Sequence, residues 1–225
     1  MNRSTRTRSE IQPDRRRPSE VARHVVLPAD IRTTGWPRVE AQARACGIEY
    51  DGWQRQLGRC ILGKTSDGVY AAGIGGVVVS ICRQVGKTFL IGTMIVMLCI
   101  LNEYPLKVLW TAHRTRTSDE TFKFMCALVR RKAISRFVDG EPRRANGQQE
   151  IVFVNSSRIM FGARENGFGR GFDSVDVEVF DEAQILTERA LDDMIPATNA
   201  APNPLIIYMG TPPKPSDPSE VFSTS

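Results

Sequence analysis

The segment Gly86-Lys87-Thr88 has the residue types that bind nucleotide phosphates, and it follows the apolar run 77–81. A strand that delivers a loop to a helix N-terminus aims backbone N–H groups at phosphate oxygens. The apolar residues 89–101 can form that helix. Lysine in this position reaches the β- and γ-phosphates, and the following hydroxyl binds Mg²⁺. The predicted nucleotide-binding residues of this loop are Arg83, Gln84, Val85, Gly86, Lys87 and Thr88, with Thr88 also a metal ligand.

Two adjacent acids, Asp181 and Glu182, follow a later apolar run at 175–180. Hydrolysis of Mg-ATP needs one acid near the metal and a base that orients and deprotonates water. We expect Asp181 to be the metal ligand, at the end of a strand that neighbours the phosphate-loop strand, and Glu182 to be the catalytic base. Together with the phosphate loop, these acids predict a site for ATP and Mg²⁺.

The strict pattern G-x-x-x-x-G-K-[ST] occurs elsewhere, at residues 58–65. No strand-like run precedes it, and the turn-forming residues 66–68 follow it where a helix N-terminus is needed. The run before Lys87 lacks the first glycine of the pattern but is continuous and β-branched, as in a buried parallel strand. The context therefore favours Lys87 over Lys64.

The remaining pattern alternates strands with helices, which is typical of an α/β fold. Strands are predicted at 76–81, 106–111, 151–154, 158–161, 175–180 and 205–209. Helices are predicted at 88–102, 119–131 and 184–195, with a loop at 139–149 and a mixed lead-in with local helix at 28–70. These elements predict a P-loop NTPase of the ASCE type, with a mainly parallel central sheet flanked by helices.

One predicted strand does not fit a fully buried position. Asp176 and Glu178 alternate with valines in the run 175–180. A strand that is buried on both faces is expected to be apolar throughout. Either one face of this strand meets polar groups, or the start of the strand lies outside the sheet.

The charge of the chain is unevenly distributed. The net charge is +5, but residues 1–23 contain seven arginines and only three acids. The basic character therefore describes an N-terminal tail more than the folded part, and we expect residues 1–25 to be disordered. Residues 26–225 are predicted to form one ATPase domain. Five widely spaced cysteines and two histidines give no disulfide framework or zinc pattern, and no apolar run is long enough to cross a bilayer.

Over about residues 45–215 the chain resembles the ATPase domain of phage large terminase subunits, the motors that package DNA into procapsids. The resemblance rests on several motifs. They are Cys82-Arg83-Gln84-Val85-Gly86-Lys87-Thr88, Tyr50-Asp51-Gly52-Trp53-Gln54, the strand and loop 108–114, Asp181-Glu182-Ala183-Gln184, and Ile207-Tyr208-Met209-Gly210-Thr211-Pro212. An Arg-Gln pair inside a phosphate loop without its first glycine is more typical of terminases than of other P-loop enzymes.

The resemblance also implies roles for individual residues. It places Gln54 at the adenine edge and Thr211 where hydrolysis is sensed through the γ-phosphate and relayed to movement. It implies an arginine that stabilises the transition state, shortly before the Asp-Glu strand. Arg170 is favoured because of its glycine-rich setting, with Arg164 as an alternative and Arg83 as a competitor that would act in cis.

The partners that the resemblance implies are double-stranded DNA, a portal protein, the small terminase subunit and further copies of the chain in a ring on the portal. The expected location is the host cytoplasm, with no membrane association and no place in the mature virion. The nuclease domain of a full terminase is expected to be absent, so no nuclease activity is expected. The alternatives are a helicase-like nucleic-acid ATPase, for whose second motor domain the chain has no room, and a catalytically idle nucleotide-binding assembly module.

Overall fold

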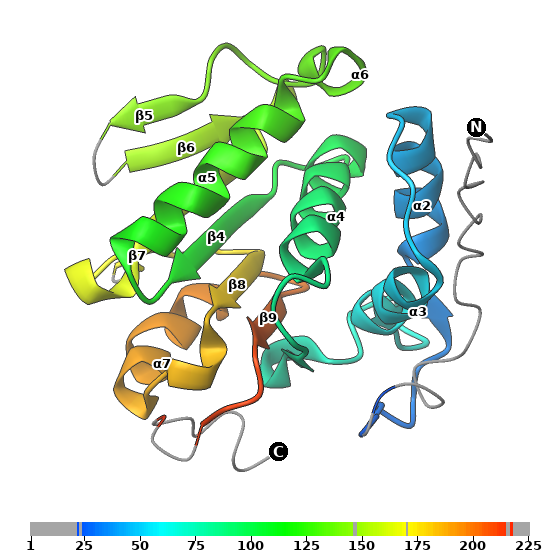
Figure 1. Cartoon of the computed structure of the whole chain (residues 1–225). Coiled ribbons are helices and arrows are strands. Elements are labelled where there is room, and N and C mark those ends of the chain that lie inside the picture. Colours follow the sequence, from blue (N-terminus) through cyan, green and yellow to red (C-terminus); the bar gives the residue numbers. More distant parts are fainter. Residues whose placement is uncertain (1–21, 23, 146–147, 170, 215–216, 218–225) are drawn as a thin grey trace, which may run out of the picture.

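The computed structural model describes residue 22, residues 24–145, 148–169 and 171–214, and residue 217. Its centre is a seven-stranded sheet in the order β3-β9-β8-β4-β7-β6-β5 (Figure 1). In that order, the strands are Val77–Ser80, Leu205–Gly210, Val177–Asp181, Lys107–Ala112, Arg158–Ala163, Gln148–Val152 and Arg143–Ala145. The first five are parallel, and the last two extend the sheet by antiparallel pairing. The predicted α/β class with a mainly parallel sheet is confirmed.

Helices cover both faces of this sheet. The helices are α2 (Trp36–Ala45), α3 (Gly52–Ile61), α4 (Lys87–Leu101), α5 (Thr115–Val129), α6 (Lys132–Ser135) and α7 (Glu188–Met194). Short 3₁₀ turns lie at η1 (Gly73–Gly75), η2 (Arg164–Asn166), η3 (Ala183–Ile185) and η4 (Ile195–Thr198). A two-stranded antiparallel sheet joins β1 (Thr33–Thr34) to β2 (Gly63–Lys64). Helices α2, α4 and α5 share one core with the sheet, and the η3–α7–η4 segment forms a second core on the opposite face.

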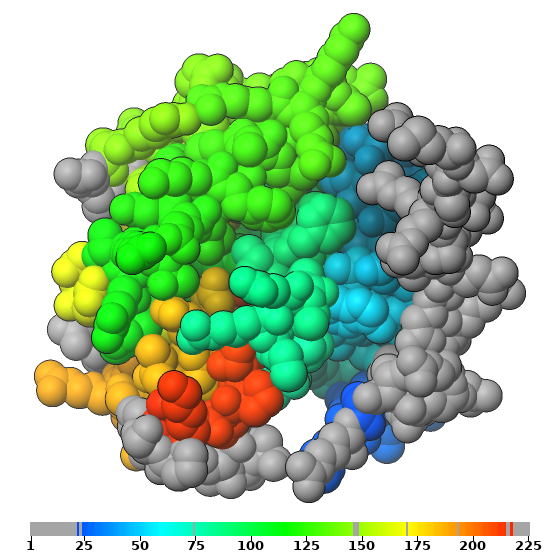
Figure 2. Space-filling view, in the orientation of Figure 1, coloured from blue at the N-terminus to red at the C-terminus, as the bar shows by residue number. Residues whose placement is uncertain are grey.

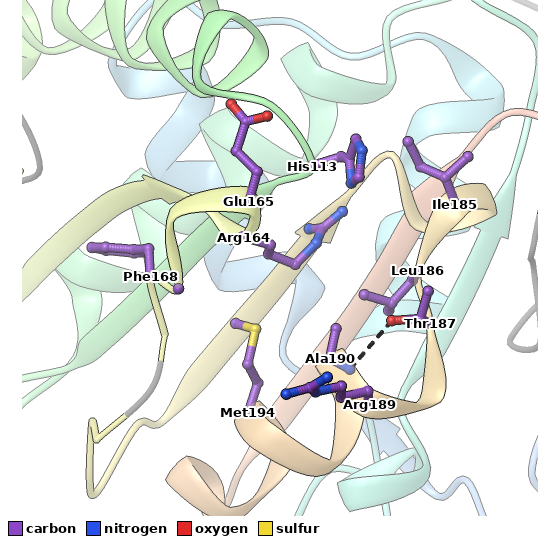
Figure 3. Close-up of a pocket in the computed structure, with 11 residues that line it drawn as sticks. His113, Arg164, Glu165, Phe168, Ile185, Leu186, Thr187, Arg189, Ala190 and Met194 are labelled. Atoms are coloured by element: carbon purple, nitrogen blue, oxygen red, sulfur yellow. Dashed lines mark hydrogen bonds between the residues drawn. The ribbon is translucent and has the colours of Figure 1, made fainter.

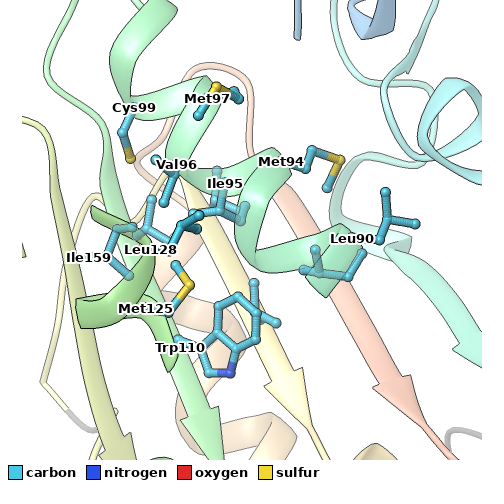
Figure 4. Packing of buried hydrophobic residues seen from close by; sticks show 14 of the residues in the cluster. Leu90, Met94, Ile95, Val96, Met97, Cys99, Trp110, Met125, Leu128 and Ile159 are labelled. Atoms are coloured by element: carbon cyan, nitrogen blue, oxygen red, sulfur yellow. The ribbon is translucent and has the colours of Figure 1, made fainter. Parts of the chain in front are cut away.

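Helix α4 is the central element of the larger core. Its side chains are apolar almost all the way round, because the sheet, α2 and α5 all pack against it. Figure 4 shows Ile95 and Val96 of α4 near Trp110 of β4 and Met125 of α5. The N-terminus of α4 carries Lys87, so this packing fixes the position of the phosphate loop. None of the helices in the described ranges has both the length and the apolarity needed to span a membrane.

The phosphate-loop strand is less buried than predicted. Strand β3 lies at the edge of the described sheet and pairs only with β9 there. Val79 is 3% exposed, whereas Val78 is 39% exposed. The prediction of a buried parallel strand is confirmed for the parallel pairing and is wrong for the burial. The β-branched residues of β3 suit a strand that pairs with β9 and packs one face against the core.

Other boundaries also differ from the prediction. The expected loop 139–149 contains β5 and the start of β6. The helix expected from residue 119 begins at Thr115, whose backbone N–H donates to the Glu165 carboxylate at 2.8 Å. The helix expected at 184–195 is divided, because Thr187 leaves the helix and caps α7 with its hydroxyl, which accepts from the Ala190 N–H. The disordered tail predicted at residues 1–25 lies mostly outside the described residues.

The two acids that interrupt the β8 pattern have different surroundings. The Asp176 carboxylate accepts the Lys107 N–H at 2.8 Å, so Asp176 ties the start of β8 to β4. Glu178 is completely buried among the apolar residues of the second core, and neither carboxylate oxygen has a hydrogen-bond partner among the described residues. Burial raises the pKa of Glu178 to about 8, although the Arg164 charge opposes this shift. The strand is thus inside the sheet, and Glu178 is a carboxyl group without polar compensation.

This burial predicts that Glu178→Gln stabilises the protein at alkaline pH. The folded protein holds a proton on Glu178 that the unfolded chain releases, because the pKa rises from 4.5 to about 8 on folding. Unfolding free energy is therefore lost as pH rises through this interval, by a few kcal/mol at about 1.4 kcal/mol per pKa unit. Denaturant unfolding at pH 5 and pH 8.5 should show the stabilising effect of Glu178→Gln only at the higher pH.

The exposed carboxyl of Glu103 provides the control, since Glu103→Gln removes a similar charge from the surface. Equal effects of the two substitutions on the pH dependence would contradict the assignment to Glu178. The charged and titratable groups whose fields reach Glu178 are the Arg164 guanidinium and the Tyr208 hydroxyl.

Candidate nucleotide-binding site

The phosphate loop runs from the end of β3 to the first turn of α4. Gly86 precedes the helix with a left-handed backbone (φ 98°), which glycine adopts without strain. The Lys87 ammonium turns back into the loop and donates to the carbonyl oxygens of Ile81 and Cys82, at 2.5 and 2.7 Å. Burial lowers the pKa of Lys87, and the Asp181 charge acts in the opposite direction. The ammonium therefore lies inside the loop and within electrostatic reach of the acid on β8.

The predicted nucleotide-binding residues at 83–85 are exposed on this loop, and Thr88 lies in the first turn of α4, partly exposed. Gln84 has a left-handed backbone (φ 62°), an uncommon conformation for a residue other than glycine. The Arg83 side chain makes no hydrogen bond or ion pair with the described part of the chain. It is therefore available to a ligand that enters the loop.

Gln54 has a structural role that was not assigned from the sequence, although its spacing from Asp51 is that of a capping box. Its side chain is 4% exposed. The amide oxygen accepts the Asp51 N–H at 2.9 Å in a capping box of α3, and the amide nitrogen donates to the Gly86 carbonyl at 3.4 Å. A Cβ on Gly86 would lie 2.9 Å from that nitrogen. Gln54 thus holds α3 against the phosphate loop, and its contact with adenine stays a prediction.

The two acids lie at the end of β8. Burial raises the pKa of Asp181 to about 6, while the hydrogen bond from the Glu182 N–H and the charges of Arg164 and Lys87 act in the opposite direction. Glu182 has a left-handed backbone (φ 55°), and its Oε2 atom is buried without a partner among the described residues. Backbone strain and unsatisfied polar atoms concentrate at functional sites. Both features support a functional role for Glu182 in the candidate site.

Strand β9 lies between the loop strand and the acid strand, so the prediction that they are neighbours is wrong. The end of β9 connects them instead. The Ile81 N–H donates to the Gly210 carbonyl at 3.1 Å, and the Thr211 N–H donates to Oε1 of Gln184 at 3.2 Å. Figure 2 shows the segments near residues 85, 185 and 212 together on one face. The predicted coupling residue Thr211 is thus linked to the segment that follows Asp181 and Glu182.

Gln184 is a site residue that sequence reasoning did not assign. It is 6% exposed, and its amide oxygen faces the backbone of Thr211. Its place two residues after Glu182 was visible in the sequence, but its partner is a backbone N–H from a distant strand. Only the fold shows that contact.

The arginine candidates occupy different positions. Arg164 is fixed, since its guanidinium donates to the carbonyl and hydroxyl of Thr111, both at 3.0 Å, and to the Asp181 carbonyl at 2.8 Å. Burial lowers its pKa to about 10, so it stays charged at neutral pH. In this structure Arg164 holds the ends of β4, β7 and β8 together. Arg170 lies outside the described residues, and its assignment stays a prediction.

The pattern match at 58–65 is part of a helix and a short strand. Gly58 is in α3, where a Cβ would lie 2.1 Å from the Trp36 ring, so packing explains this glycine. Lys64 is in β2, and its ammonium lies 5.4 Å from the centroid of the Tyr70 ring. No strand-loop-helix unit exists here, as predicted.

A cavity of about 210 Å³ lies beside the acid strand, between η2 and the η3–α7 segment (Figure 3). Polar groups from His113, Arg164 and Arg189 line it together with the apolar side chains of Leu186 and Met194. None of the phosphate-loop residues lines this cavity, so it is distinct from the candidate nucleotide site.

The described residues fit Mg-ATP chemically. A glycine-supported loop ends at the N-terminus of a long helix, where backbone N–H groups favour an anion. The hydroxyl of Thr88 and the carboxylate of Asp181 are oxygen ligands of the type that Mg²⁺ prefers. The orphaned Oε2 of Glu182 provides an acceptor for a water molecule. This combination defines a candidate site for a metal-bound nucleoside triphosphate.

The sheet order, the loop at its edge and the acids on the third strand define a P-loop NTPase fold. The large terminase of bacteriophage HK97 matches with a TM-score of 0.63 and 18% identity, over 79% of this chain and 38% of that chain. The large terminase ATPase domain of Thermus phage P74-26 matches with a TM-score of 0.60 and 13% identity, over 84% of this chain and 71% of that domain. The chain therefore spans well under half of the HK97 protein. No protein-family model and no curated protein matches the sequence. The predicted resemblance to terminase ATPase domains is confirmed for the fold.

The position of the loop predicts that Lys87→Ala weakens nucleotide binding and that Lys64→Ala does not. The Lys87 ammonium is in the loop, whereas Lys64 contacts Tyr70 in a separate small sheet. Titration with a fluorescent ATP analogue should give parental affinity for Lys64→Ala and at least about tenfold weaker binding for Lys87→Ala. A loss of affinity in Lys64→Ala would place the nucleotide at 58–65 instead.

The contact of Gln184 with Thr211 predicts a loss of turnover without a loss of nucleotide affinity. In Gln184→Ala the Thr211 N–H loses its acceptor at a partly buried position, which costs about 1 kcal/mol. We expect kcat to fall about tenfold or more, with KM little changed. Gln184→Glu keeps an acceptor oxygen and should restore part of kcat. Equal losses in both variants would contradict the hydrogen-bond role.

Proposed function

We propose that this chain is the ATPase motor domain of a viral DNA-packaging terminase, which hydrolyses Mg-ATP to drive double-stranded DNA into a procapsid. The observation that carries this proposal is the linkage of three motifs at one edge of the sheet. The loop strand, the end of β9 and the acid segment are joined by the Ile81–Gly210 and Thr211–Gln184 hydrogen bonds. The shared fold with the two terminase structures supports it.

Each group has a defined task in this proposal. Lys87 leaves the loop carbonyls and contacts the phosphates, and Thr88 and Asp181 hold the metal. Bound Mg²⁺ neutralises charge that develops on the transferred phosphoryl group. Glu182 orients water and accepts its proton at the carboxylate. Arg83 or Arg170 stabilises the phosphate charge, and Thr211 passes a change at the phosphates to the segment of Gln184.

The proposed partners are duplex DNA, a portal protein, the small terminase subunit and other copies of the chain in a ring on the portal, within the host cytoplasm. A ring on the portal would let one subunit supply its arginine to the next. Stimulation of ATP hydrolysis by added duplex DNA and portal protein would support the motor function. Tight ATP binding without turnover under all these conditions would instead identify an idle nucleotide-binding module.

The base assignment predicts that Glu182→Gln binds ATP but does not hydrolyse it. The amide keeps the size of the side chain but cannot accept the proton of the attacking water. The expected loss in kcat is about 100-fold or more, the usual contribution of general base catalysis. Phosphate release and ATP-analogue titration measure the two quantities separately. Glu120→Gln, an exposed change on α5, is the control. Parental turnover in Glu182→Gln would exclude Glu182 as the base.

A further inference from the structure

The folded part of the chain gathers positive charge in one segment. Residues 130–144, called here the basic rim, contain six lysines and arginines and two acids, a net charge of +4. Since the whole chain is +5 and residues 1–23 carry +4, the residues outside the tail and the rim have a net charge of −3. The overall charge therefore conceals a local basic surface on a mildly acidic domain.

The rim forms a continuous outer edge of the sheet. It runs from the end of α5 through α6 to β5, which is the sheet edge opposite to the phosphate-loop strand. Val138 bridges to Phe153, so the segment between α6 and β5 follows β6 (Figure 1). The cations of the rim are all exposed. They are Arg130, Arg131, Lys132, Arg136, Arg143 and Arg144.

Acids neutralise only a small part of this charge. Glu141 is paired with Arg130 at 2.7 Å. Glu150, the cross-strand partner of Arg143, is already paired with Arg158 at 3.3 Å. Among the described residues, the other five rim cations form no ion pair with an acid. These side chains are therefore free to meet external anions.

We propose that the basic rim binds the phosphate backbone of duplex DNA. This inference rests on the proposed motor function and adds the surface on which the DNA lies. Several exposed lysines and arginines on one edge of the domain can contact the phosphates of a duplex and release condensed counterions. The rim is separated from the nucleotide loop by the width of the sheet, so DNA and ATP occupy different surfaces. A charged edge strand also discourages edge-to-edge pairing of sheets, and the experiment separates this explanation from DNA binding.

The test compares the parent chain with the variant Arg131→Gln/Lys132→Gln/Arg144→Gln. The matched control removes three exposed arginines from the region of α2 and α3, in Arg32→Gln/Arg38→Gln/Arg59→Gln. Anisotropy of a short labelled duplex is measured over a range of salt concentrations. Each lost phosphate contact should reduce the slope of log affinity against log salt by about 0.9. We expect the rim variant to lose two to three such contacts and to bind at least about tenfold more weakly, while the control retains the parental slope.

Basal ATP hydrolysis and thermal unfolding are measured on the same preparations. Arg144→Glu alone serves if the triple variant is unstable, and it should also weaken DNA binding. A parent that binds duplex DNA with an affinity and slope shared by the rim variant overturns the rim proposal and leaves the motor function intact. Equal binding of polyglutamate and duplex DNA also overturns it, in favour of an acidic-polymer surface. Absence of ATP hydrolysis in the parent counts against the proposed function, whatever the rim shows.

Discussion

The parallel pairing of β9 with both β3 and β8 is the constraint on which the candidate site depends. Carboxyl ends of parallel strands meet at one edge of a sheet, and here three of them deliver the loop, the Gly210-Thr211 turn and the two acids. The hydrogen bond from Ile81 to Gly210 fixes the height of the loop relative to β9. Because β9 pairs with both β3 and β8, it fixes the position of Lys87 relative to Asp181 and Glu182. The apolar packing of α4 against the core then fixes the position of this helix, which begins at the loop.

The sequence was sufficient to locate the strands that consist of runs of apolar residues. Strand 106–111 and the hairpin around residue 155 were close to β4, β6 and β7 because their cores are periodic and their turns are polar. Strand β5 was missed, since Arg143-Arg144-Ala145 has no large apolar residue and pairs with β6 in the sheet. The break before α7 had a visible signal, because Thr187 is a typical N-cap residue.

The candidate site was predictable in its residue types but not in its connections. The choice of Lys87 over Lys64 followed from context, and the structure shows why, because Trp36 packs where Gly58 lies. The roles of Gln54, Gln184 and Arg164 as bracing residues could not be predicted, since each contacts backbone atoms far away in the chain. Side-chain contacts with distant backbone leave no periodic pattern, so only the tertiary fold reveals them.

The position of the Lys87 ammonium has a consequence for the proposed binding of a nucleotide. This ammonium donates to the carbonyl oxygens of Ile81 and Cys82, so the cation also has acceptors within the loop itself. An incoming phosphate therefore competes with two backbone oxygens for the same side chain. The affinity of the loop for a phosphate therefore depends on the difference between the contacts of Lys87 with the phosphate and its contacts with the two carbonyl oxygens. A substitution that weakens the internal set, even one that never touches the ligand, would tighten binding.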